Sequence, residues 1–531
     1  MSHRAATRKP ESLRALSALK KVVLLFACLA GNASAAITLN PIGGYDSGLI
    51  DQDAAEIVAH DPDSQRLFVV NGAISAIDVL DISDPTTPLQ VGTIEVSPTL
   101  GAGANSVAVY NGVVAVAVES VPAQEPGKVA FFDASTLQLI NHLQVGALPD
   151  MLTFTPDGTY LVVANEGEPD DDYLVDPEGS ISIIGTRGGD IASLNQSDVK
   201  TASFTGPIKF INRNSVRVFG PGASVAQDLE PEYITIFQAN TGSRHPRWKA
   251  MVTLQENNAM AQIDLYRARV DRVIGLGFKN HNEPQNAIDA SNRDSRISIN
   301  PWPVYGMYQP DAIASYVVDN RPYFVTANEG DARDYDGFSE EDRVGDLLLD
   351  SEKFPDAATL QLDENLGRLK ITNTLGDFDQ DGDFDGLFSY GGRSFSIYNR
   401  RGRQLFDSAS MFEFVTASAS PSRFNSQGTS DSFDSRSDDK GAEPEGVEIA
   451  VLDDRTYAFI GLERIGGIVI YDVTNPRAPF FVNYSNTSES LGDIAPEGLK
   501  FIPAGDSPNG KPLLVVGFEF SGTTRIFEIQ Q

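Results

Sequence analysis

Two acidic positions recur along the chain, and both lie beside short apolar runs. The first position opens a repeated unit and reads Glu56, Asn105, Asp150, Glu232, Asp311, Glu445 and Glu497. The second position follows the central apolar run of the unit and reads Asn71, Glu119, Glu166, Glu256, Glu329, Glu463 and Glu519. Carboxylates gathered in this number repel one another and raise one another's pKa unless a cation or a basic group intervenes.

Calcium is the metal ion that such a set of hard oxygen ligands favours, ahead of magnesium or manganese. The alternative interpretation is that the carboxylates only cap strand ends by accepting hydrogen bonds from backbone N–H groups. The calcium interpretation predicts six ligands from the two recurring positions: Glu166, Glu232, Glu329, Glu445, Glu463 and Glu497.

A second acidic motif runs from Asp377 to Asp385. Its Asp-x-Asp-x-Asp-Gly core places carboxylates at loop positions 1, 3 and 5 and a glycine at position 6, as in a calcium-binding loop. Position 12 is Phe388 in place of the usual bidentate glutamate, and no flanking helix pair is evident. We expect an isolated calcium loop that pins an insertion, with an acidic surface turn as the alternative. The predicted ligands are Asp377, Asp379, Asp381 and Asp383.

Basic residues are few, and several lie in two long insertions at about residues 331–394 and 404–442. A cation beside a metal cluster can hold and stabilise the anionic oxygens of a phosphoester. The sequence therefore offers Arg393 and Lys440 as candidate catalytic residues, with simple ion pairing as the alternative role for each. The chain contains no nucleophile elbow, zinc-protease motif, P-loop or dinucleotide fingerprint.

The elements that must position these residues are short β-strands. Each unit combines a short strand, a strongly apolar strand and a third strand of the type x-Ile-x-Ile-x-Asp, and the unit is seen seven times. Connecting segments such as Leu89–Glu95 and Phe480–Tyr484 supply a fourth strand. We therefore predict an all-β fold, a seven-bladed β-propeller whose ring is closed by the N-terminal strand Ile37–Gly43. A single domain, residues 36–531, then accounts for the length.

The 531 residues carry a formal net charge of −32, which argues against a nucleic-acid binder. Residues 1–35 have the basic, apolar and small-residue order of a secretory signal peptide. We expect cleavage after Ala35 in preference to lipidation of Cys28, the single cysteine. The apolar run Val22–Ala30 is too short to span a bilayer, and no later segment approaches the required length. The prediction is export to the periplasm or the extracellular space.

Several segments resemble the bacterial choice-of-anchor I family, and the resemblance covers nearly the whole mature chain. They include Ala164–Pro169, Asp228–Tyr233, Leu254–Asn258, Thr326–Tyr335 and Asp434–Gly446. The resemblance implies a secreted or surface-attached propeller, similar to mesenchyme-specific cell-surface glycoproteins. Some similar proteins carry alkaline-phosphatase names, but no agreed catalytic residues come with the family. The sequence stops at Gln531 without an added anchor helix, which favours a periplasmic or released protein.

Three functions remain open at this point. The first is a calcium-dependent phosphoesterase, in which axial carboxylates hold the ion that activates water against a small phosphate ester. The second is a non-catalytic propeller whose calcium rigidifies loops that bind an extracellular protein or glycan. A lactonase-type hydrolase is a third reading, because the same acidic axis could polarise a lactone carbonyl. Propeller folds host many functions, so the fold alone does not choose among them.

Overall fold

The computed structural model describes residues 37–239 and 247–531, which form an all-β fold of mostly antiparallel strands. The predicted signal peptide, residues 1–35 with Cys28, lies outside the described residues. Within the described ranges, no helix is long and apolar enough to cross a membrane. The α-helices are short: α2 (Val225–Asp228), α3 (Ala357–Leu360), α4 (Met411–Ala419) and α5 (Ser488–Leu491).

Seven of the sheets contain four or five strands each, and we number these sheets in chain order. Sheet 1 contains β2 (Val58–Asp61), β3 (Arg66–Asn71), β4 (Ala76–Asp81) and β5 (Leu89–Glu95). Sheet 2 contains β6 (Ala104–Tyr110), β7 (Val113–Val118), β8 (Pro126–Asp133) and β9 (Leu139–Ala147). Sheet 3 contains β10 (Pro149–Phe154), β11 (Tyr160–Asn165), β12 (Ser180–Gly185) and β13 (Val199–Ser203).

Sheet 4 has five strands, because the short β14 adds to it in parallel with β18. Its strands are β14 (Phe210–Ile211), β15 (Ile234–Gln238), β16 (Trp248–Leu254), β17 (Ala259–Asp264) and β18 (Arg269–Gly275). Sheet 5 contains β21 (Ile313–Val318), β22 (Arg321–Asn328), β28 (Ser394–Asn399) and β29 (Gln404–Asp407). Sheet 6 contains β30 (Pro444–Leu452), β31 (Arg455–Leu462), β32 (Ile468–Asp472) and β33 (Phe480–Ser485). Sheet 7 contains β34 (Pro496–Ile502), β35 (Leu513–Phe518), β36 (Thr523–Gln530) and β1 (Thr38–Asp46).

The core lies between neighbouring sheets. Strand β7 reads Val-Val-Ala-Val-Ala-Val, and such a continuous run of β-branched and small residues suits a strand that is covered on both faces. One buried cluster joins Phe68 and Val70 of sheet 1 to Val114 and Val116 of sheet 2. The repeated antiparallel four-stranded sheet, packed face to face with the next, is the building unit of a β-propeller.

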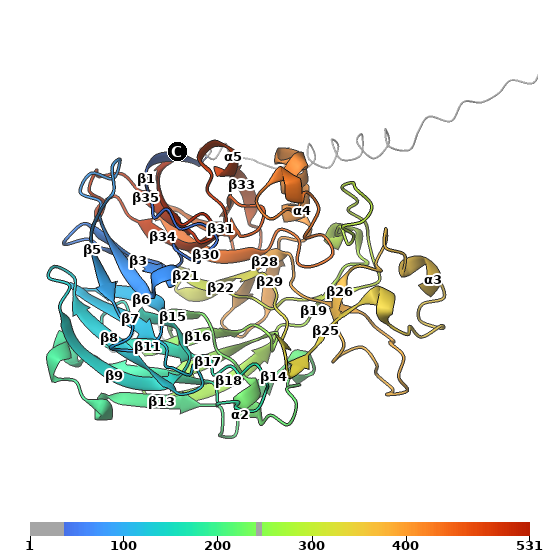
Figure 1. The fold of residues 1–531 in the computed structure, drawn as a ribbon, viewed down its shortest axis with the longest axis horizontal. Coiled ribbons are helices and arrows are strands. Elements are labelled where there is room, and N and C mark those ends of the chain that lie inside the picture. Colours follow the sequence, from blue (N-terminus) through green and yellow to red (C-terminus); the bar gives the residue numbers. More distant parts are fainter. Residues whose placement is uncertain (1–36, 240–246) are drawn as a thin grey trace, which may run out of the picture.

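The first strands of neighbouring sheets lie next to one another in the interior of the fold, and we call this central region the axis. Contacts join β2 to β6, β6 to β10, β10 to β15, β15 to β21, β21 to β30, β30 to β34 and β34 to β2. Figure 1 shows β6, β15, β21 and β30 in the interior of the ribbon, with β5, β9 and β13 toward its rim. Residues at the start of the first strands therefore lie near the axis.

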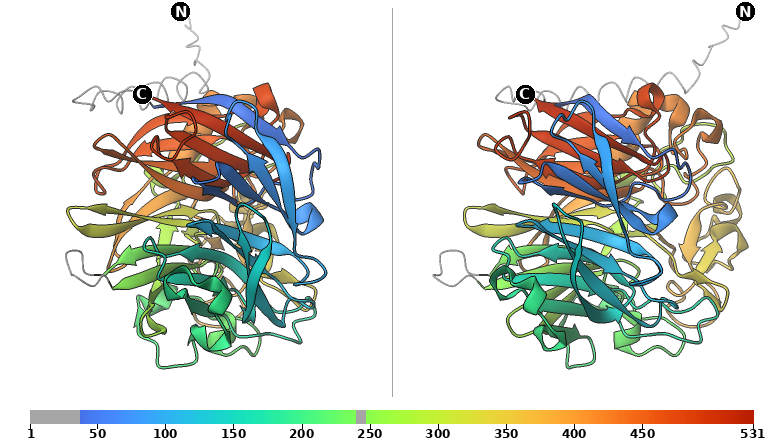
Figure 2. Two further views of the ribbon diagram at one scale, coloured as in Figure 1. Left: turned by 90° about the vertical axis from the view of Figure 1, so that its left-hand side faces the viewer. Right: turned by 60° about the vertical axis from the view of Figure 1, so that its left-hand side comes forward.

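Strand β1 pairs antiparallel with β36 and so brings the N-terminal segment into the last sheet. Thr38 lies opposite Gln530 and Leu39 opposite Ile529. Figure 2 shows the blue N-terminal strand alongside the red C-terminal strands. Sheet 7 thus combines both ends of the described chain.

Residues 278–307 and 331–394, which connect strands of the large sheets, form a separate unit that we call the lateral module. It has a hydrophobic core of its own and lies beside the sheets in Figure 1. The predicted insertion at 331–394 lies here, and Ser394 begins β28 of sheet 5. The sequence did not reveal that residues 278–307 join the same module. Its strands are β19 (Phe278–Asn280), β20 (Tyr305–Met307), β23 (Asp334–Tyr335), β24 (Phe338–Ser339), β25 (Glu341–Arg343), β26 (Lys370–Thr372) and β27 (Phe388–Ser389). Strand β29 places the start of the predicted 404–442 insertion in sheet 5.

The pairing of β1 predicts that single side chains in this strand matter for stability. Leu39 is buried in the cluster between sheets 6 and 7, so Leu39→Ala should lower the free energy of unfolding by about 2 kcal/mol. The exposed neighbour Asn40 provides the matched control, and Asn40→Ala should change little. Thermal or denaturant unfolding measures both, and equal stabilities would show that β1 does not contribute.

Candidate metal centre

The acidic side chains of the second recurring position follow the second strands of their sheets. Glu166 comes directly after β11, Glu329 after β22 and Glu463 after β31. The backbone N–H of Glu166 donates to the carbonyl of Leu148 at 2.8 Å, and that of Glu463 donates to the carbonyl of Glu443 at 2.8 Å. These hydrogen bonds hold the end of the second strand against the start of the first, so both recurring positions meet at the same end of the axis.

A left-handed turn leads into the first strand in four sheets. The φ angles are 44° at Leu148, 40° at Gln309, 49° at Glu443 and 62° at Ala495, and each residue stands before a proline and an acid. A residue with a Cβ occupies this region at a cost of about 1 kcal/mol or more. Its recurrence at equivalent places shows that the turn is a fixed feature of the repeat. The acids that it directs toward the axis are Asp150, Asp311, Glu445 and Glu497.

Glu166, Glu232 and Glu256, which we call the triad, form the first group of carboxylates. Each offers one oxygen, and these oxygens all lie within 4.8 Å of one another. Glu232 is 7% exposed and Glu256 is 6% exposed, yet the Oε2 atom of each has no hydrogen-bond partner among the described residues. No Lys or Arg of the described ranges forms an ion pair with the triad. Buried oxygens of this kind are costly unless they are neutralised or bound by a cation.

The triad carboxyls all have raised pKa values. Burial is the largest cause for each, and repulsion from neighbouring acids adds to it. The pKa of Glu256 rises to about 8 because of burial and the nearby Asp331, although Arg333 lowers it. The pKa of Glu232 rises through burial and the charges of Glu256 and Glu166. A cation that binds here would therefore displace protons as it ionises the carboxyls.

A second group, the lysine cluster, consists of Glu329, Glu443, Glu463 and Lys440. One oxygen of each glutamate lies within 4.8 Å of the others. The Lys440 ammonium donates to Glu329 Oε1 at 2.8 Å and lies 3.6 Å from Glu443 Oε2. Glu463 is paired with Arg464 at 2.8 Å. Unlike the triad, this group already contains positive charge.

Glu443 is the axial residue that the sequence did not single out, because it precedes Pro444 and stands outside both recurring positions. It is fully buried. Burial alone would raise its pKa, but the cations of Lys440, Arg436 and Arg464 outweigh that effect and lower the pKa to about 2. Arg436 Nε donates to Glu443 Oε1 at 2.6 Å. Glu443 is therefore ionised at neutral pH.

The remaining predicted ligands lie around these two groups. Glu445 and Asp311 each bring an oxygen within 4.8 Å of Glu329. Glu497 belongs to neither group in the described part of the chain. Burial and the charges of Glu56 and Glu519 raise its pKa. Burial and the charge of Glu519 raise the pKa of Glu56 to about 8. Five of the six predicted axial ligands thus lie in one or another of three carboxylate groups. These groups also contain three residues that were not selected: Glu256, Asp311 and Glu443.

The two predicted catalytic cations have different surroundings. Lys440 lies in the lysine cluster, as described. Arg393 is 3% exposed and donates to Glu413 Oε1 at 2.9 Å and to the carbonyl oxygens of Asp289, Ser437 and Asp439 at 2.7 to 2.8 Å. None of these partners belongs to the triad or the lysine cluster. Arg393 thus links the connecting segments that contain Asp289, Glu413 and Ser437, and it makes no contact with the axial carboxylates.

A different arginine neutralises acids beside the triad. Arg333, from the first insertion, is buried and donates to Glu230 Oε2 at 2.6 Å, and it also pairs with Asp228. Its guanidinium lies 4.6 Å from the ring centre of Phe219. Because the Arg333 guanidinium pairs with Asp228 and Glu230, it forms no ion pair with the triad, and the triad oxygens stay unpaired.

The acidic loop forms a tight turn around its first aspartate. Asp377 Oδ1 accepts a hydrogen bond from the Gln380 N–H at 2.7 Å, and Gly382 has a φ of 98° that favours glycine. The carboxylates that converge within 4.8 Å are Asp377, Asp379 and Asp385. The predicted ligands Asp381 and Asp383 are not members of this group. Asp385, at loop position 9, stands in their place.

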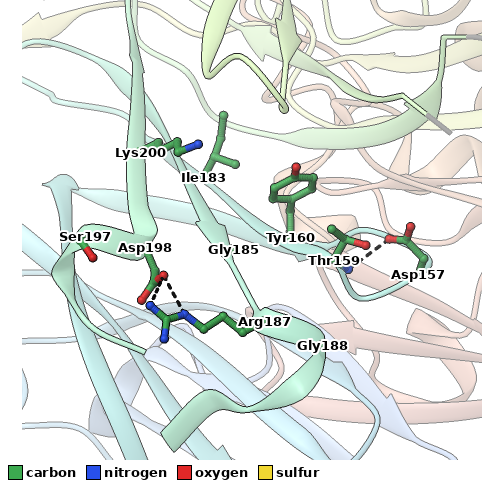
Figure 3. Close-up of a pocket in the computed structure, with 10 residues that line it drawn as sticks. All are labelled: Asp157, Thr159, Tyr160, Ile183, Gly185, Arg187, Gly188, Ser197, Asp198 and Lys200. Atoms are coloured by element: carbon green, nitrogen blue, oxygen red, sulfur yellow. Dashed lines mark hydrogen bonds and ion pairs between the residues drawn. The ribbon is translucent and has the colours of Figure 1, made fainter. Parts of the chain in front are cut away.

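A hollow of about 340 Å³ lies on sheet 3, away from these clusters (Figure 3). Its lining includes Tyr160, Lys200 and an ion pair between Arg187 and Asp198 at 2.8 Å. It shares no residue with the triad or the lysine cluster. The hollow therefore does not belong to the candidate metal centre.

The repeated sheets and their acidic axis define an all-β protein of the propeller type. The choice-of-anchor I domain matches residues 56–476, and the chain belongs to this family. The family assignment indicates a cell-surface or secreted protein. Gigasin-3a of Magallana gigas is 34% identical over 192 residues, which are 32% of this chain and 67% of that protein.

Two solved structures align with most of the chain at low sequence identity. A chain titled Kuenenia stuttgartiensis Hydrazine Synthase aligns with 91% of this chain and 99% of its own length, at a TM-score of 0.46 and 13% identity. A chain titled Streptogramin B lyase structure aligns with 94% of this chain and 100% of its own, at a TM-score of 0.45 and 10% identity.

The pKa of Glu256 predicts how stability depends on pH in calcium-free buffer. Its folded-state pKa of about 8 exceeds the ordinary value of 4.5. The stabilisation from the protonated carboxyl is complete below about pH 4.5 and is lost as pH rises through 8. The melting temperature in EDTA should therefore fall between about pH 5 and 8, and less steeply for Glu256→Gln, which cannot ionise. Identical slopes for the two proteins would contradict this.

Proposed function

We propose that the chain is an exported, seven-bladed β-propeller, closed by β1, whose axial carboxylates bind calcium. The contacts that run from β2 around to β34 and back support the ring, and the pairing of β1 with β36 supports its closure. The family's cell-surface or secreted character supports export to a calcium-rich compartment, either the periplasm or the extracellular space.

The triad is the observation that carries the calcium proposal. Three oxygens within 4.8 Å, two of them on buried side chains without a partner in the described residues, fit a cation with several hard ligands. Glu166 comes from sheet 3, whereas Glu232 and Glu256 flank strands of sheet 4. An ion at the triad would therefore join two sheets and stabilise the axis. The same proposal assigns a second, more weakly bound calcium ion to Asp377, Asp379 and Asp385.

In this proposal calcium is structural, and the propeller binds an extracellular protein or glycan. We expect Glu232→Gln to lose one bound calcium ion, because it replaces a triad carboxylate by an amide of equal size. The loss should also reduce the rise in melting temperature that calcium produces. Metal counting by mass spectrometry on dialysed residues 36–531, with thermal unfolding on the same sample, measures both.

Two further variants calibrate that count. Asp377→Asn should lose the loop ion and leave the triad ion bound, since the loop lies in the lateral module. Glu125→Gln changes an exposed glutamate outside all clusters and should retain every ion. If Glu232→Gln retains as much calcium as Glu125→Gln, the triad does not bind the ion.

A phosphoesterase is the second candidate function. It is favoured by the position of Arg464, which is 37% exposed while its guanidinium pairs with Glu463 in the lysine cluster. A partly exposed cation beside metal-binding carboxylates can bind the anionic oxygens of a phosphate ester.

Turnover of an aryl phosphate by residues 36–531 distinguishes the two functions. The phosphoesterase predicts hydrolysis that stops when calcium is chelated and that falls at least 10-fold in Arg464→Gln and Glu445→Gln. The structural function predicts bound calcium with no hydrolysis. Calcium-independent turnover would contradict both assignments of the axial carboxylates.

A further inference from the structure

Lys440 occupies a place among carboxylates that resembles the triad. Its side chain is 11% exposed, and its ammonium lies 2.8 Å from Glu329, 3.6 Å from Glu443 and 3.7 Å from Asp331. It belongs to the segment between β29 and β30, which lies outside the repeated units. Three carboxylates thus surround one ammonium near the axis.

The triad and the lysine cluster each contain two carboxylates from the second recurring position of the repeat: Glu166 and Glu256 in the triad, and Glu329 and Glu463 in the lysine cluster. Glu166 and Glu329 each follow the second strand of a sheet, as Glu463 does in sheet 6. In both groups three carboxylate oxygens approach within 4.8 Å. The difference is that the lysine cluster contains an ammonium, whereas no basic residue of the described ranges pairs with the triad.

We propose that the Lys440 ammonium is a built-in cation that stands in for a metal ion at a second divalent-metal position. It contacts Glu329 and Glu443 of this position, and Glu463 completes the set of carboxylates. The axis then has two cation positions, one for a dissociable ion at the triad and one filled permanently by the chain. This inference rests on the proposed function only for the triad ion, since the contacts of Lys440 are independent of it.

The charges around Lys440 support this assignment. Arg436 and Arg464 bind Glu443 and Glu463, but Glu329 has no other charged donor among the described residues. Its Oε2 accepts a hydrogen bond only from the neutral amide of Gln255, at 3.0 Å. Without the ammonium, Glu329 would keep a buried oxygen beside Asp311 and Glu445, whose oxygens lie within 4.8 Å. The carboxylates of Glu329, Glu443 and Glu463 supply the hard oxygen donors that calcium needs.

The test is to remove the ammonium and count calcium. Lys440→Ala opens the position of the ammonium and should bind one calcium ion more than the wild type. Lys440→Arg keeps the charge and should bind the wild-type number. Lys249→Ala is the matched control, because Lys249 is a largely buried lysine that pairs with Asp264 at 3.1 Å outside the clusters. Equilibrium dialysis with metal counting measures all four proteins.

Calcium-dependent stability gives a second readout if Lys440→Ala does not fold. Lys440→Gln keeps most of the side-chain volume without the charge, and calcium should raise its melting temperature more than it raises that of the wild type. Equal increments, or an unchanged ion count in Lys440→Ala, would overturn the inference. The variant Glu232→Gln separates this result from the proposed function. If the double variant Glu232→Gln/Lys440→Ala binds one calcium ion more than Glu232→Gln alone, the inference about Lys440 is supported even if the triad binds no ion.

Discussion

Electrostatic repulsion between buried carboxylates is the main constraint on the centre of this protein, because these side chains lie close together. The repeat places an acid at the end of successive strands, and the contacts between neighbouring sheets bring several of these acids together as buried side chains. Burial raises the pKa of Glu232, Glu256 and Glu463, so that each costs free energy when it ionises. Positive charge near the axis is therefore a condition for a stable ionised state of the fold.

The chain supplies part of this charge from segments that do not belong to the repeat. Arg333 comes from the first insertion and pairs with Asp228 and Glu230, whereas Lys440 comes from the second and enters the lysine cluster. The insertions are thus linked to the axis through ion pairs as well as through the apolar core of the lateral module. Within the described ranges no Lys or Arg forms an ion pair with the triad, which is why an external ion is assigned to it.

The repeat made the strands and the recurring acids predictable from sequence, because both follow a regular pattern along the chain. Leu89–Glu95 was predicted as a fourth strand and forms β5. The neutralising partners were not predictable in this way. Glu443 lies outside the repeat, and Arg393, chosen for its nearness to the acidic motifs in sequence, turns instead toward Glu413 and backbone carbonyls. Which cation meets which carboxylate depends on how the insertions fold back, and no local pattern encodes that.

The pairing of β1 with β36 also determines where the molecule would be attached to a cell surface. Because Thr38 lies opposite Gln530, the first and last described strands end side by side at one edge of sheet 7. A lipid, a membrane segment or a wall-sorting peptide joined at either end would attach the protein at this edge of sheet 7. Either mode of attachment would therefore join the molecule at the same place, beside the paired strands β1 and β36.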